Sequence, residues 1–185
     1  MFKRKGSNMK QDTFTMDLKT IRQRARQHIE EGAKTPGYRA KVDTVLKLLN
    51  EALATELVCV LRYKRHYFMA AGMNSDSVKQ EFLQHATEEQ QHADEIAARI
   101  VQLGGEPNFS PDGILTRSHS EYVEGKTLED MIKEDLVAER VAIDSYRGMI
   151  DYIGNDDPTT RRMLETIQAK EEEHAEDMAS LLAQH

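Results

Sequence analysis

Six acidic and imidazole residues recur in this 185-residue chain at spacings that suit metal binding. Four of them form two glutamate-x-x-histidine pairs, and the other two are single glutamates that precede the glutamates of those pairs by 33 and 32 residues. In chain order they are Glu56, Glu89, His92, Glu139, Glu171 and His174. Residues three apart on a helix share one face, so each pair presents a carboxylate and an imidazole together. Such mixed oxygen and nitrogen donors suit iron or manganese better than metals that prefer thiolates.

These charged residues occupy positions where the helical pattern calls for apolar side chains. Glu56 lies three residues after Leu53 and four before Val60, and Glu139 lies between Leu136 and Ile143 at the same spacing. Burying an unpaired carboxylate costs several kcal/mol, and protonation, ion pairing or metal coordination is the usual remedy. For any one glutamate alone, the alternative is a place at the edge of the apolar face, where it reaches water.

The register of the two helical hairpins favours coordination. The first lone glutamate lies 16 residues before the turn at 72–74, and the motif glutamate and histidine lie 15 and 18 residues after it. About the turn at 154–156 the corresponding separations are 15, 15 and 18. All six side chains are therefore expected at one height in mid-bundle, where they would hold two metal ions.

The apolar periodicity predicts four long helices, at about 40–71, 75–103, 127–153 and 158–181. Residues 104–126 contain Pro107, Pro111 and Gly113 and read as a long connection between the second and third helices. An inter-domain linker is the alternative, but each hairpin alone would then expose its apolar stripe. The expected fold is all-α, a ferritin-like four-helix bundle with a long crossover.

The N-terminal region differs from the rest of the chain in charge. Residues 1–28 carry eight Lys/Arg and two Asp, so their net charge of +6 and the total of −7 leave −13 for residues 29–185. Residues 1–16 read as a mobile tail and residues 17–31 as a short helix, which gives two parts: 1–38, a basic tail and short helix, and 39–185, the bundle. An acidic body suits a protein that concentrates metal cations, although many acidic domains bind none.

Cysteine usage and hydropathy indicate the compartment. Cys59 is the single cysteine, so no intramolecular disulfide forms, and it is expected to be a small buried side chain. The N-terminus lacks the apolar stretch of a secretory signal or membrane span. A cytoplasmic protein that does not engage a membrane is therefore expected.

Four stretches around the candidate ligands carry a resemblance to a known family: LNEALATEL, EEQQHAD, EDLVAE and KEEEH. Across about residues 40–182 the chain resembles the bacterioferritin and Dps-like branch of the ferritin superfamily. The resemblance implies that Glu89 and Glu171 bridge two irons, that Glu56 and Glu139 each bind one iron, and that the two motif histidines complete the coordination. Tyr63 matches a tyrosine found near such centres.

The same resemblance implies a ferroxidase, which oxidises Fe(II) with dioxygen or hydrogen peroxide and stores or detoxifies iron in a homo-oligomeric shell. Gln90 stands where bacterioferritins typically have the haem-ligating methionine, which argues against a haem-containing bacterioferritin. Only 11 residues follow His174, too few for the fifth helix of large ferritins. A shell of about twelve subunits is therefore favoured over one of about twenty-four.

Two other functions remain open. A rubrerythrin-type peroxidase would usually bring a C-x-x-C pair, which the sequence lacks. A Dps-like DNA-protecting role would use the basic N-terminal region as a phosphate-binding arm, against the simpler interpretation of a solvated tail. His66 and His85 are expected at the surface or edge of the bundle.

Overall fold

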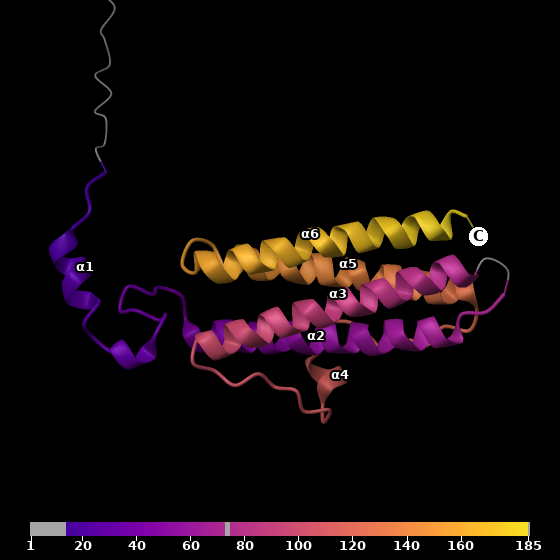
Figure 1. Ribbon diagram of the computed structural model, residues 1–185, viewed down its shortest axis with the longest axis horizontal. Coiled ribbons are helices and arrows are strands. Elements are labelled where there is room, and N and C mark those ends of the chain that lie inside the picture. Colours follow the sequence, from indigo (N-terminus) through magenta and orange to yellow (C-terminus); the bar gives the residue numbers. More distant parts are fainter. Residues whose placement is uncertain (1–13, 73–74, 185) are drawn as a thin grey trace, which may run out of the picture. The chain divides into compact units, whose positions relative to one another are not determined.

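A computed structural model describes residues 14–72 and 75–184 (Figure 1), and these divide into two compact units, one up to Gly37 and one from Tyr38 onward. In the first unit, α1 spans Leu18–Arg24 and is capped by the Asp17 carboxylate, which accepts from the Thr20 amide at 3.1 Å. A single 3-10 turn follows at Ile29–Glu31. The single helix predicted for 17–31 is therefore wrong in length: His28 adopts a positive φ of 50°, which a right-handed helix cannot contain. Most of the predicted tail, residues 1–13, lies outside the described residues.

The second unit is the predicted four-helix bundle. Its long helices are α2 (Val42–Met69), α3 (Ser75–Gln102), α5 (Leu128–Ile153) and α6 (Pro158–Leu182), within about two residues of the predicted bounds. The described residues contain no strand, so the all-α prediction is confirmed. None of the helices described has an apolar stretch long enough to cross a membrane.

The helices pair as two antiparallel hairpins joined by the predicted crossover (Figure 1). α2 packs with α3 and α5 packs with α6, while α2 also meets α5 and α3 also meets α6. The connection between α3 and α5 runs along the bundle and includes one short helix, α4 (Ile114–Arg117), which contacts α2. The sequence pattern did not predict α4.

Side-chain caps begin the helices of the second hairpin. The Thr127 hydroxyl accepts from the Asp130 amide at 3.1 Å, and the Asp130 carboxylate accepts from the Thr127 amide at 3.2 Å. This reciprocal box forms even though Asp130 is shorter than the usual glutamate or glutamine. Asp157 caps α6 by accepting from the Thr160 amide at 2.9 Å, and Pro158 occupies the first helical position as predicted.

The apolar core is divided into two clusters. One contains the early part of α2, with Leu49 and Leu53, and the other contains its later part, with Tyr63. Between them α2 places Glu56, so a polar layer separates the two clusters. Leu61, an apolar residue of the same helix, is 54% exposed and belongs to neither cluster.

A buried ionic cluster ties the crossover to the bundle. Asp135 on α5 accepts from Arg62 Nε at 2.8 Å and contacts His66 Nδ1 at 2.8 Å, both on α2. Arg62 also donates to the Glu121 carbonyl at 2.8 Å, and His66 Nε2 contacts the Glu124 carbonyl at 3.1 Å. The prediction of a surface position for His66 is therefore wrong, because this cluster holds the ring fully inside the bundle.

Candidate metal centre

The structure brings all six predicted side chains together at the middle of the bundle. Each long helix contributes to this layer: α2 and α5 supply one glutamate each, and α3 and α6 supply a glutamate and a histidine each. All six side chains are buried. They form two overlapping groups whose donor atoms lie within 4.8 Å of one another. The groups are Glu56, Glu89, His92 and Glu171, and Glu89, Glu139, Glu171 and His174.

The two motif histidines face the shared carboxylates from opposite halves of the layer. His92 Nδ1 lies 2.9 Å from Glu171 Oε1, 3.2 Å from Glu89 Oε2 and 3.5 Å from a Glu56 oxygen. His174 Nδ1 lies 3.4 Å from Glu89 Oε1 and 3.6 Å from Glu171 Oε2. Each shared carboxylate therefore directs one oxygen to each histidine.

The layer contains more buried acceptors than the protein satisfies. Each of its four carboxylates has one buried oxygen without a hydrogen-bond partner among the described residues, and so does His174 Nδ1. Buried polar atoms are nearly always paired in native proteins, so this concentration of unpaired donor atoms indicates a site built for a bound species. Carboxylate oxygens and an imidazole nitrogen that converge in this way fit a pair of metal ions.

Two tyrosines hold the outer oxygens of the non-shared carboxylates. Tyr63 on α2 donates to Glu139 Oε1, and Tyr146 on α5 donates to Glu56 Oε1. Burial, and then the charge of the contacted glutamate, raise the pKa of both phenols well above the usual value, so both remain donors. The family resemblance identified Tyr63 but not Tyr146. The available signal was spacing, because each tyrosine lies seven residues after its helix's glutamate.

In the metal-free layer, two glutamates and both motif histidines have raised pKa values. Burial and the nearby charge of Glu89 raise the pKa of Glu56 to about 8, and the same causes raise that of Glu139. Burial alone would lower the pKa of His174, but its contacts with Glu171 and Glu89 raise it to about 10. The pKa of His92 is also raised against the effect of burial, through Glu171, Glu56 and Glu89.

His85, which was predicted at the surface or edge, lies fully buried beside the centre. Its ring stacks on His174 with 3.9 Å between ring centroids, and its Nδ1 lies 3.1 Å from the Tyr63 hydroxyl. Burial and the charge of His174 lower the pKa of His85 to about 4. The prediction failed because His85 belongs to no spaced motif, and only the docking of α3 against α6 places it there.

The single cysteine lies on α2, three residues after Glu56. Cys59 is buried, as predicted, and burial raises the pKa of its thiol.

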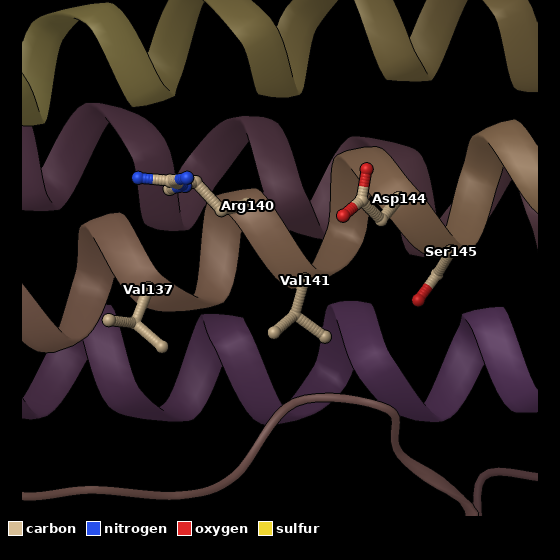
Figure 2. Close-up of a pocket in the computed structure, with 5 residues that line it drawn as sticks. All are labelled: Val137, Arg140, Val141, Asp144 and Ser145. Carbon is tan, nitrogen blue, oxygen red and sulfur yellow. The ribbon is translucent and has the colours of Figure 1, made fainter.

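A shallow hollow of about 560 Å³ lies on the outer side of α5, where Val137, Arg140, Val141, Asp144 and Ser145 line it (Figure 2). No candidate ligand contributes to this hollow, so it is separate from the metal centre.

Comparison with known proteins identifies relatives over most of the chain. The family described as the ferritin-like domain matches residues 46–185. A bacterioferritin of Mycobacterium leprae is 31% identical over 140 residues, which cover 75% of this chain and 84% of the relative. A nutrient stress-induced DNA-binding protein of Nostoc is 33% identical over 140 residues, or 73% of this chain and 75% of that protein.

Solved structures show the same architecture. The dodecameric thioferritin of Bacteroides fragilis, a bacterioferritin-related protein, superimposes with a TM-score of 0.76 at 28% identity, covering 79% of this chain and 88% of that one. Dps from Thermosynechococcus elongatus gives a TM-score of 0.73 at 21% identity, over 76% of this chain and 90% of that one. The second likeness concerns the fold alone.

Proposed function

This chain belongs to the ferritin superfamily, in its bacterioferritin and Dps-like branch, and we propose that it is a ferroxidase that stores or detoxifies iron. One observation carries the proposal: two four-residue donor groups share Glu89 and Glu171 in a fully buried layer. Two Fe(II) ions per subunit are the proposed substrate and occupants of these groups.

The orientation of the carboxylates supports a specific role for each. Glu89 and Glu171 direct separate oxygens toward the two histidines and would bridge the irons. Glu56 lies on the His92 side, at 3.5 Å, and Glu139 lies on the His174 side, at 3.9 Å from Nδ1, so each would bind one iron. Four carboxylates and two neutral imidazoles then balance the charge of two Fe(II) ions.

The surrounding residues keep this arrangement fixed during oxidation. Two bound Fe(II) ions together supply two electrons to dioxygen or hydrogen peroxide. Tyr63 and Tyr146 each hold one oxygen of a glutamate by donating to it, which orients the other oxygen toward the centre. The apolar clusters on both sides of the layer limit the access of water along the bundle.

The proposal includes a homo-oligomeric shell in the cytoplasm. The bacterioferritin-related thioferritin of Bacteroides fragilis is described as dodecameric, which supports about twelve subunits for this chain as well. Haem is not part of the proposal, since Gln90 occupies the expected methionine position and its amide donates to Asp94 at 3.0 Å.

Anaerobic Fe(II) titration followed by exposure to oxygen tests the proposal, with particle mass recorded on the same sample. We expect two irons per chain, rapid oxidation and a mass near that of a dodecamer. Glu56→Ala should abolish rapid oxidation and leave the fold intact, because the buried carboxylate and its desolvation cost are removed together. Glu51→Ala on the same helix is the control, since the Glu51 carboxylate contacts Lys47 and His119, outside the metal layer. Fewer than two irons per chain without oxidation would refute the ferroxidase.

A second candidate function, DNA protection, rests on the basic N-terminal unit. Lys19, Arg22 and Arg24 are exposed on α1, and a relative 33% identical to the chain is described as DNA-binding. Phosphate contacts of this kind weaken steeply with salt. We expect a gel shift at low salt that disappears at high salt and on deletion of residues 1–24, which removes these three side chains with the basic residues before them; no shift at low salt would exclude this role.

A further inference from the structure

A second acidic cluster lies just outside the metal centre, where α3 meets α6. Glu81 and His85 lie four residues apart on α3, and Asp177 lies on α6, three residues after His174. His85 Nε2 is 3.5 Å from an Asp177 oxygen and 3.9 Å from a Glu81 oxygen. One donor atom from each residue lies within 4.8 Å of the others.

The buried histidine directs an unpaired nitrogen at this cluster. His85 is fully buried, and its Nε2 has no hydrogen-bond partner in the described part of the chain. Tyr63 donates its hydroxyl proton to Glu139, so its oxygen is left to accept from Nδ1–H of His85. In the neutral ring the lone pair is then on Nε2. It faces Glu81 and Asp177, and this grouping of three electron-rich atoms calls for a cation between them.

We propose that Glu81, His85 and Asp177 form a third divalent-cation site, distinct from the two-metal layer. Their nitrogen and oxygen donors suit Zn(II), Fe(II) and similar ions. Ligands bound tetrahedrally at about 2.1 Å lie about 3.4 Å apart, and the observed 3.5 and 3.9 Å separations are close to that value but too long for hydrogen bonds.

The position of this site connects the metal layer with solvent. The side chains of Asp177 and Glu81 are 53% and 38% exposed, so a hydrated cation reaches them directly. Partial burial, and then the charges of Asp177 and Glu88, raise the pKa of Glu81, which reflects the excess of negative charge there. On the inner side, the His85 ring stacks on His174. A cation in the third site is thus separated from the two-metal layer by these stacked imidazoles.

Zn(II) binding to the full chain tests the proposal, because Zn(II) undergoes no redox chemistry. Equilibrium dialysis should give three Zn(II) per chain for the wild type and two for the double variant Glu81→Gln/Asp177→Asn. The matched control is Glu95→Gln/Glu176→Gln, which removes two exposed charges from the same helices and should retain three. Anomalous diffraction from Zn(II)-loaded crystals should place one ion between the three residues.

The outcomes separate this proposal from the ferroxidase. If the wild type and the double variant Glu81→Gln/Asp177→Asn both bind two Zn(II), and no anomalous peak appears at His85, the third site is overturned and the two-metal layer stands. If the wild type binds one Zn(II) and the double variant binds none, the third site is supported and the two-metal layer is overturned. Binding of three Zn(II) by the double variant would also overturn the third site.

Discussion

Loading the metal-free layer with two divalent ions is expected to release at least two protons per chain at pH 7. The pKa of Glu56 is raised to about 8 and that of His174 to about 10, so both groups hold a proton at this pH. The pKa values of His92 and Glu139 are raised as well. Two divalent ions bring four positive charges, which stabilise the ionised carboxylates and neutral imidazoles once the protons have left.

The number of released protons should depend on pH in a way that identifies Glu56. At pH 9 the count should be about one lower than at pH 7, because Glu56 is already ionised whereas His174 still holds its proton. Each proton displaced makes the apparent free energy of metal binding about 1.4 kcal/mol more favourable per pH unit. Metal affinity should therefore rise steeply between pH 6 and 8.

A pH-stat titration with Zn(II) in weakly buffered solution measures this release. Glu56→Gln is the internal control, because the amide keeps the shape but has no proton to give, so the release at pH 7 should fall by one. Zn(II) bound at His85 adds no proton from that ring, whose pKa is lowered to about 4. Fewer than about two protons per chain at pH 7, or equal release at pH 7 and pH 9, would refute the reasoning.

Three further predictions concern the residues around the layer. Asp135→Ala should lower the free energy of unfolding by about 3–5 kcal/mol, because Arg62 would remain buried without its carboxylate partner. Urea unfolding measures this loss beside the control Asp144→Ala, which removes an exposed carboxylate, and an equal loss of stability in the two variants would contradict the prediction. Tyr146→Phe should weaken Zn(II) binding about tenfold or more, because Glu56 loses its donor, and an unchanged Kd in calorimetric titration would count against it. The metal-free protein should lose stability between about pH 6.5 and pH 10, because folded His174 keeps its proton up to a pKa of about 10 whereas the unfolded side chain releases it near 6.5. Thermal melting across this range measures the loss, and a rising melting temperature would disprove it.

Much of the bundle could be predicted because a helix advances by a constant rise per residue. Once the turns near residues 72–74 and 154–156 are fixed, counting residues places each lone glutamate level with its glutamate-x-x-histidine pair. The structure puts those six side chains in one layer, as that count requires. The short helix α4 and the end of α1 at Arg24 escaped prediction, because they depend on local backbone conformation and not on apolar periodicity.

The sequence alone therefore determined the helices, the register within each hairpin and the six candidate ligands. The tertiary structure decided every contact between the hairpins, since these depend on how α2 docks on α5 and α3 on α6. Tyr146 reaches Glu56 across 90 residues of chain, and Arg62 reaches Asp135 across 73. The burial of His85 also depends on the docking of the two hairpins. No spacing marks it, yet the packing of α3 against α6 buries its ring on His174 and directs its free nitrogen toward Asp177.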